Sequence, residues 1–152
     1  IVGYNFGAQK IDRVKQTLKL GIVSGVVITS SGFFICELFP HAVSAIFTDS
    51  DHLIDLAVDG LRITVIMFPF VGAQIVIGNF FQSIGKAKIS IFLSLTRQLL
   101  YLLPCLLLFP NWWGLKGIWI SMPVSDALAF ITAVISLIIY IKKVSKQHLI
   151  AE

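Results

Sequence analysis

Charged residues are scarce in this 152-residue chain, which leaves little material for polar chemistry. Only 13% of the residues are charged, against about 25% in an ordinary soluble domain. The two cysteines, Cys36 and Cys105, lie in apolar stretches without the spacing of a metal site, which favours small buried apolar side chains over a redox pair. The sequence shows no nucleophile–base set, phosphate-cradling glycine loop or metal-ligand cluster, so we expect no enzyme, no metal and no cofactor.

Hydrophobic residues, by contrast, make up 57% of the chain and gather in four long stretches. A helix needs about 20 mostly apolar residues to cross a hydrocarbon core of about 30 Å, and each stretch reaches that length. The sequence therefore predicts an all-α, polytopic transmembrane helix bundle with four full spans, at about 20–39, 61–84, 89–109 and 114–141. A soluble bundle would have to bury nearly all of these stretches, and they lack the alternation of membrane β-strands.

Basic residues lie beside alternate ends of these spans. The clusters are Lys10, Arg13, Lys15 and Lys19, then Lys86 and Lys88, then Lys142, Lys143 and Lys146. The opposite connections carry Asp49, Asp51, Asp55 and Asp59 with Arg62, or Lys116 alone. Because Lys and Arg accumulate on the cytoplasmic side, we expect the three basic clusters and the C-terminus to be cytoplasmic. The net charge of +4 is thus explained by the membrane, and no nucleic-acid partner is expected.

Two charged residues lie deep inside the predicted spans. Arg97 is about 12 Å from the inner end of the third span, and Asp126 is about 18 Å from the outer start of the fourth. The two residues therefore lie close in height, where an unpaired charge is costly. We predict an ion pair or a shared polar pocket. The alternative is that Arg97 extends to the inner lipid headgroups while Asp126 accepts local hydrogen bonds.

Three uncharged amides and three prolines also lie within the spans. The amides of the second span are Gln74, Asn79 and Gln82, which form either hydrogen bonds between helices or a wall of a substrate cavity. The prolines Pro69, Pro104 and Pro123 lie one in each of the last three spans. Because a proline ring displaces a backbone hydrogen bond, each predicts a kink or loosened turn that serves as a hinge.

Smaller signals concern packing and the ends of the spans. Gly21 and Gly25 have a small-residue spacing that permits close helix contact. Trp112 and Trp113 lie in a predicted outer turn, at the membrane–water boundary. Residues 11–19 have an amphipathic pattern, either as a helix on the inner surface or as the lead-in to the first span. The three histidines are expected in solvated loops or the tail, at His41, His52 and His148.

Several segments, in order, resemble the multidrug and toxic compound extrusion (MATE) transporters. Residues 2–10, Val-Gly-Tyr-Asn-Phe-Gly-Ala-Gln-Lys, resemble the inner end of that family's eighth membrane helix, and residues 79–87, Asn-Phe-Phe-Gln-Ser-Ile-Gly-Lys-Ala, resemble the end of its tenth. Arg97-Gln98 with Pro104, and then Gly114-x-x-Gly117-Ile118-Trp119 with Pro123-x-x-Asp126, resemble its last two helices. The resemblance covers essentially all 152 residues.

The resemblance implies a place in a larger protein. The family has twelve membrane helices in two lobes, so residues 1–152 would belong to the C-terminal lobe, with the four spans as helices nine to twelve. The chain opens Ile1-Val2-Gly3 without a methionine, and we expect a fragment. The implied partners are the lipid bilayer, the missing N-terminal lobe and small cationic or amphipathic drugs. The implied location is a bacterial inner membrane.

The resemblance also implies an activity, which is drug efflux by alternating access driven by entry of Na⁺ or H⁺. On this view Gln74, Asn79, Gln82, Arg97 and Asp126 line the substrate or ion pathway. Some members bind the coupling ion through acidic residues in the seventh and tenth helices. The stretch 61–84 has no acidic residue, so the sequence does not place the ion site.

Two other functions stay open. A lipid-linked polysaccharide flippase of the same superfamily would line its cavity with more cationic residues than Arg97 alone. A non-transporting scaffold subunit would have no continuous cavity and no ion-dependent flux.

Overall fold

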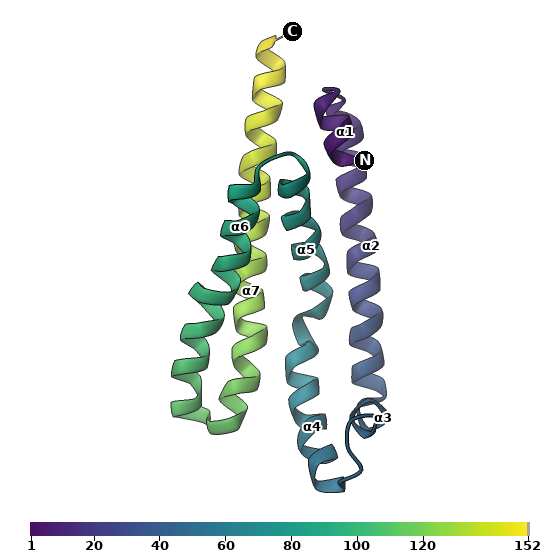
Figure 1. Ribbon diagram of the computed structural model, residues 1–152, viewed down its shortest axis with the longest axis vertical. Coiled ribbons are helices and arrows are strands. Elements are labelled where there is room, and N and C mark those ends of the chain that lie inside the picture. The colour runs from purple at the N-terminus through teal and green to yellow at the C-terminus, as the bar shows by residue number, and fades with distance from the viewer. Residues whose placement is uncertain (152) are drawn as a thin grey trace.

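A computed structural model describes the backbone of residues 1–151 and the side chains of residues 1–144. Within that part of the chain all regular structure is helical and no strand occurs, which confirms the all-α class. The helices lie side by side in one elongated bundle, with the first helix and the last part of the last helix at the same end (Figure 1). Two residues that the sequence singled out, Lys146 and His148, have side chains outside the described residues.

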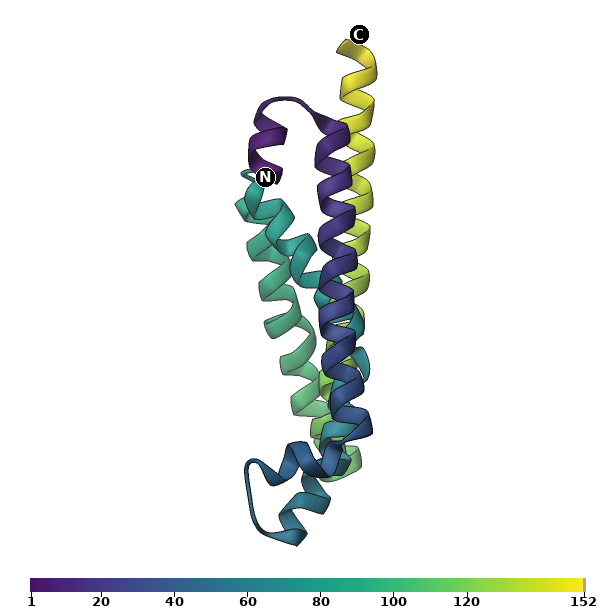
Figure 2. The same cartoon turned by 90° about the vertical axis from the view of Figure 1, so that its right-hand side faces the viewer.

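The first segment is a short helix that folds back on a long one. α1 (Val2–Gly7) is joined to α2 (Ile11–Leu38) by a bend in which Gln9 has a φ of 57°. Figure 2 shows the chain looping over between the two helices. The predicted lead-in and the first span form one continuous helix of 28 residues. Because no break separates them, the lead-in is an extension of the span rather than a separate surface helix.

The second segment runs back along α2. The short α3 (Pro40–Ala45) closes the connection, and α4 (Asp51–Thr64) then leads into α5 (Phe68–Ser83) through a single 3₁₀ turn, η1 (Val65–Met67). This turn comes just before Pro69, whose ring crowds the preceding turn and whose nitrogen donates no hydrogen bond. The helix thus departs from α geometry just before Pro69, where the sequence predicted a kink or loosened turn, and the role of Pro69 as a hinge stays a prediction.

The third segment is a hairpin of two helical arms, one before and one after Gly114. α6 (Ala87–Leu95) continues through a π-helical stretch, η2 (Thr96–Leu102), into α7 (Leu103–Ala151). Within α7, Gly114 has φ 55° and ψ −134°, which is not helical geometry. Figure 1 shows the ribbon reversing direction at this end of the bundle, so that the far part of α7 returns beside α6. The reversal falls where the sequence predicted an outer turn.

Three helical ranges among the described residues are long and apolar enough to cross a membrane. They are Ile11–Leu38, Asp51–Ser83 and Ala87–Val144. The last of these contains the reversal at Gly114, so it is a hairpin rather than one straight rod. The predicted number of four spans depends on taking the two arms of this hairpin separately.

Small residues bring α2 and α5 into close contact. A β-carbon added to Gly72 would overlap the carbonyl oxygen of Gly25 and the hydroxyl of Thr29. Added to Gly21, it would lie 3.3 Å from a methyl group of Val76, also on α5. The close packing predicted from the spacing of Gly21 and Gly25 is therefore confirmed, and α5 is the helix that uses it.

Aromatic contacts hold α4 and α5 in register with the second arm of α7. A β-carbon on Gly60 would meet the indole of Trp119 at 2.7 Å. Further along, the rings of Phe70 and Phe130 are 5.2 Å apart, and Phe81 packs against Tyr140 at 5.5 Å. In each pair the partner on α7 comes about 60 positions later, so the two helices run parallel with a constant offset.

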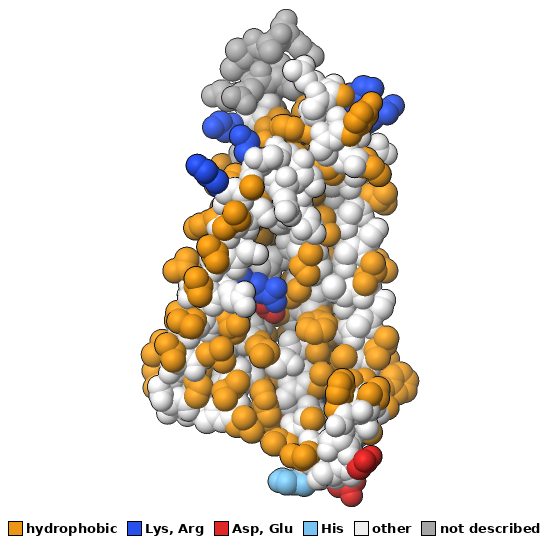
Figure 3. Space-filling model, in the orientation of Figure 1, with side chains coloured by type: hydrophobic (Ala, Val, Ile, Leu, Met, Phe, Trp, Pro, Cys, Tyr) orange, Lys and Arg blue, Asp and Glu red, His pale blue; other side chains and the backbone are white. Residues whose placement is uncertain are grey.

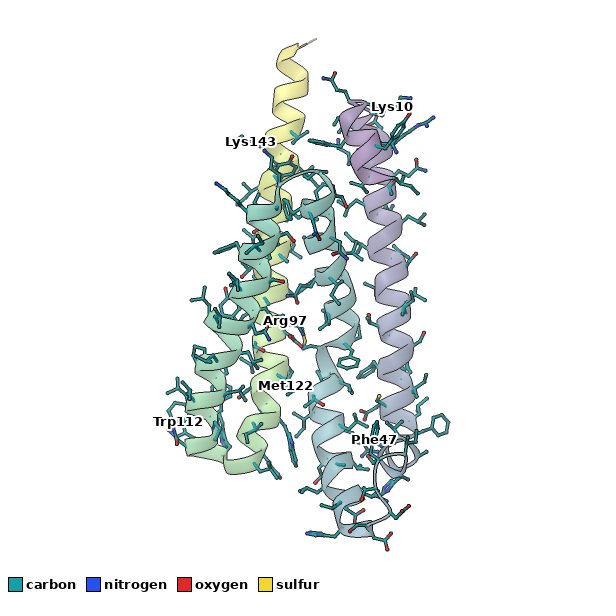
Figure 4. All side chains as sticks on the ribbon, in the orientation of Figure 1. Lys10, Phe47, Arg97, Trp112, Met122 and Lys143 are labelled. Carbon is teal, nitrogen blue, oxygen red and sulfur yellow. The ribbon has the colours of Figure 1, made fainter. Side chains whose placement is uncertain are left out.

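Charge separates toward the two ends of the bundle, and apolar side chains cover its middle. Lys10 and Lys143 lie at the same end (Figure 4), and acidic side chains lie at the opposite end (Figure 3). Large apolar side chains are exposed along the length of the helices, among them Leu20 at 67%, Ile28 at 71% and Leu107 at 66%. A surface of this kind is suited to lipid rather than to water.

Candidate functional site

One ion pair joins η2 to α7, and its carboxylate is buried. The Nε of Arg97 donates a hydrogen bond to the Oδ1 of Asp126 at 2.7 Å. The side chain of Asp126 is 9% exposed and that of Arg97 is 38% exposed. The other ion pair among the described residues joins Arg62 to Glu37 at 3.8 Å, and both of its side chains are more exposed. The pairing of Arg97 with Asp126 that the sequence predicted is present.

The backbone around Arg97 is unusual. Arg97 lies in η2, where the helix widens to π geometry, a feature that recurs at functional sites. Pro104 follows shortly after and offers no N–H to the carbonyl of Leu100, four residues earlier. The sequence predicted a loosened turn at Pro104. It did not predict that the irregularity would extend back to the charged residue.

Arg97 lies midway along the bundle, between the lysine-rich end and the hairpin turn (Figure 4). Its hydrogen bond to Asp126 joins the two arms of the hairpin at this depth. The contact supports the predicted pair over the alternative, in which Arg97 extends to the inner headgroups and Asp126 accepts only local hydrogen bonds.

The ion pair lies at the depth of the break in the neighbouring span. With the offset of about 60 positions, Asp126 on α7 lies level with Ile66 in η1. Contacts between η1 and α7 agree with this register. Two departures from α-helical geometry, the 3₁₀ turn of η1 and the π turn of η2, therefore lie near the depth of this charged pair, and α7 contacts both of them. Irregular turns are the places where a helix bends most easily.

Two buried side-chain oxygens among the described residues have no hydrogen-bond partner. They are Oε1 of Gln74 and Oγ1 of Thr96. Gln74 is 8% exposed and Thr96 is 3% exposed. A buried oxygen left without a partner costs free energy, so it marks either strain or a functional position. Sequence analysis named Gln74 but missed Thr96, whose signal was a hydroxyl next to Arg97 in an apolar stretch.

The other amides of the second span behave differently. Asn79 and Gln82 are exposed, whereas Gln74 is buried. The structure therefore does not gather the three amides into one buried group. Asn79 and Gln82 remain on the outside of the described bundle.

A second polar contact joins the two arms of the hairpin. The hydroxyls of Tyr101 and Thr132 lie 2.8 Å apart. Thr132 also donates to the carbonyl of Leu128 within its own helix, so Tyr101 is the donor when both bonds form. Neither residue was singled out from the sequence, because hydroxyls that bond their own helix are common in membrane spans.

The third predicted hinge has no break in the helix. α7 continues through Pro123 without interruption. On either side, Ser121 donates to the carbonyl of Gly117, and Ser125 donates to that of Met122. Both serines are almost fully buried. The role of Pro123 as a hinge stays a prediction.

The described residues hold no group of three or more His, Cys, Asp or Glu side chains that could surround a metal ion. Cys36 and Cys105 are free and partly exposed.

Comparison with known proteins gives a consistent result. The sequence profile of the MatE family matches residues 1–107. A solved chain named only "protein A" is 38% identical, with a TM-score of 0.84 over 90% of this chain. No protein of curated function matches the chain.

Two further solved structures share the fold at 20% identity. They are an inward-facing and an outward-facing conformation of a multidrug resistance MATE family transporter of the MOP superfamily, with TM-scores of 0.90 and 0.89. They cover 96% and 95% of this chain. This chain, in turn, spans about a third of the length of the solved chains, between 31% and 34%.

Proposed function

Because this chain belongs to the MatE family, whose members are membrane transporters and not enzymes, we propose that it forms part of a secondary active drug exporter. The exporter moves small cationic or amphipathic drugs by alternating access, in exchange for Na⁺ or H⁺. The match of the family profile over residues 1–107 is the observation that carries this proposal.

The chain supplies four of the exporter's membrane crossings in this proposal. Because the chain reverses at Gly114, the third apolar range crosses the membrane twice. The four spans then correspond to helices nine to twelve of the C-terminal lobe. This chain covers only about a third of the length of the solved chains, which supports a partner lobe contributed by further sequence. Alternating access needs two opposing halves around a central site, so the described part does not transport by itself.

The orientation follows from charge. The end that carries Lys10 and Lys143 faces the cytoplasm, and the acidic end faces outward. The C-terminus is then cytoplasmic, in a bacterial inner membrane. Arg97 and Asp126 lie at mid-depth between these ends, as expected for a substrate or ion pathway near the bilayer midplane.

The pathway runs past the ion pair. Gln74 and Arg97 with Asp126 form its deep polar part, while Asn79 and Gln82 face the half of the cavity that the partner lobe completes. The turns beside Pro69 and Pro104 bend as the cavity changes its open side. The coupling ion is Na⁺ or H⁺, and Asp126, paired with Arg97, is an acidic side chain held midway along the described bundle.

An export assay tests the proposal. The complete gene is expressed in a bacterial strain without its main drug pumps, and efflux of a fluorescent cationic dye is followed with and without a Na⁺ or H⁺ gradient. We expect efflux that stops when one of the two gradients is collapsed. Movement of lipid-linked saccharide without drug efflux would identify a flippase, and the absence of any ion-dependent flux would identify a scaffold subunit.

A further inference from the structure

A groove opens at the lysine-rich end of the bundle, with α1 and α2 on one side and α7 on the other (Figure 1). Its volume is about 340 Å³, including the part that is open to the surroundings. Phe6 of α1, Phe80 of α5 and Tyr140 of α7 line it, together with one face of α2. The backbones of α2 and α7 do not pack against each other among the described residues, so the groove separates them.

The face of α2 that lines the groove belongs to the amphipathic stretch found in the sequence. Ile11, Val14, Lys15 and Leu18 follow at helical spacing, and all four line the groove. Val14 and Leu18 are buried, whereas Lys15 is exposed. The accessible wall of the groove is apolar, so Lys15 contributes its aliphatic stem and its ammonium lies beyond the wall. The groove therefore combines an apolar wall with a cation at its edge.

The lysine-rich end carries more positive charge than the described chain balances. Residues 1–20, 84–90 and 140–144 hold eight Lys or Arg, four in the first range and two in each of the others. The same ranges hold one acidic residue, Asp12. Neither ion pair among the described residues includes any of these side chains. An anion near the groove is therefore attracted to this end.

These features together select a ligand with two unlike parts. A soluble phosphate would meet the positive charge but would leave the apolar wall without a partner. An extended peptide would place backbone N–H and C=O groups against a wall that offers them no hydrogen bond. A phospholipid joins an apolar chain to a phosphate, and basic pockets between membrane helices bind anionic headgroups. A lipid with net negative charge fits better than a zwitterionic one, whose ammonium the surrounding lysines repel.

We propose that this groove binds an anionic phospholipid of the adjacent leaflet, with one acyl chain against Phe80 and Tyr140 and its phosphate on Lys15. The bound chain fills the space between α2 and α7, so the lipid connects two helices that do not pack directly. The site is separate from the ion pair of Arg97, which lies midway along the bundle. It goes beyond the proposed function, because lipid binding requires membrane insertion but no drug export.

Photocrosslinking in the complete transporter locates the site. The protein is placed in phosphatidylcholine vesicles that contain phosphatidylglycerol with a photoreactive diazirine on one acyl chain, and labelled peptides are identified by mass spectrometry. Phosphatidylcholine with the same diazirine is the matched probe. We expect the phosphatidylglycerol probe to label the peptides that include Val14 and Tyr140 more strongly. Equal labelling by the two probes overturns the inference, as does the absence of label from these peptides, which would mean that another part of the complete protein covers the groove.

Charge variants measure what Lys15 contributes. Native mass spectrometry of the complete transporter in detergent gives its affinity for phosphatidylglycerol. We expect Lys15→Gln to lower this affinity about fivefold, the loss typical of one basic residue near an anionic lipid. Lys88→Gln removes the same charge from an exposed position at the same end that does not line the groove, so its effect is smaller. Equal losses in the two variants overturn the inference, because they indicate attraction to the whole basic end.

A filled groove gives an independent measurement. Ile141 lines the groove and is partly exposed, so Ile141→Phe occupies space that the acyl chain needs. Ile139→Phe makes the same change on the same helix, at a position that is 63% exposed and does not line the groove. We expect Ile141→Phe to weaken phosphatidylglycerol binding several-fold and Ile139→Phe to leave it unchanged. Equal binding by the two variants overturns the inference.

Discussion

Arg97 and Asp126 are 29 positions apart in the chain and joined at 2.7 Å, across the two arms of a hairpin. The contact fixes the face of each arm that turns inward. A buried pair of this kind adds little net stability over apolar residues, but it is expensive to break, because the remaining charge loses its partner. The pair thus constrains how the arms slide or rotate relative to one another.

Removing one charge tests that constraint. Asp126→Asn leaves Arg97 uncompensated, which costs about 3–5 kcal/mol for a fully buried pair and less here because Arg97 is 38% exposed. We expect a lower melting temperature of the purified complete protein and reduced drug export at equal expression. The double variant Arg97→Leu with Asp126→Leu removes both charges and recovers most of the stability. If Asp126→Asn changes neither the melting temperature nor drug export, the ion pair does not constrain the two arms.

The contact between α2 and α5 gives a second prediction. Gly72→Ala places a methyl group against the carbonyl oxygen of Gly25, which is backbone and cannot move alone. The helices must separate, at a cost of about 1–3 kcal/mol typical of overpacking. The matched control is Gly78→Ala on the same helix, where an added β-carbon meets nothing within 4 Å. Thermal unfolding in detergent compares the two. Equal melting temperatures would mean that the helices are not tightly packed.

The parts of the fold that could be predicted from sequence are those set by composition and local chemistry. The helical class, the apolar ranges and the turn before residue 114 follow from hydropathy and turn-forming residues. The pairing of Arg97 with Asp126 was predictable because depth can be counted along a helix of known rise. The close face of Gly21 and Gly25 was predictable for the same reason, since small residues four apart share a side.

Other features depend on how the helices pack, which the sequence alone does not specify. The π turn at η2 includes Arg97 and ends shortly before Pro104, and of these features only the proline predicted a local irregularity. The burial of Thr96 and the exposure of Gln82 depend on which helix covers each face. Gln74 and Gln82 both belong to α5, yet the structure buries only the first.

The π turn leads to a third prediction. Pro104→Ala restores an N–H for the carbonyl of Leu100, so the widened turn is expected to tighten toward an α-helix. The isolated helix gains up to about 3 kcal/mol, yet Arg97 is rotated relative to Asp126. We therefore expect equal or higher thermal stability together with export reduced several-fold. Leu103→Ala, an exposed neighbour, is the control and should leave export unchanged. If Pro104→Ala exports drug as fast as the unmodified protein, this turn does not act as a hinge.

The hairpin gives the last prediction, which concerns the number of crossings. Asn111 is exposed just before Gly114, beside Trp112 and Trp113, whose indoles suit a membrane boundary. Lys88 is exposed at the other end of the arm. If each arm crosses the membrane once, these two positions lie on opposite sides of it.

Single cysteines at these positions measure the sidedness directly. In a background with Cys36 and Cys105 replaced by alanine, Asn111→Cys is expected to react with a membrane-impermeant maleimide in intact cells. Lys88→Cys is expected to react only after the membrane is opened. The apolar arm between the two positions is long enough to cross the membrane once. The reverse pattern, with Lys88→Cys reactive in intact cells and Asn111→Cys protected, would invert the proposed orientation. Labelling of both cysteines from the same side would exclude a membrane crossing between them and, with it, the four-span arrangement.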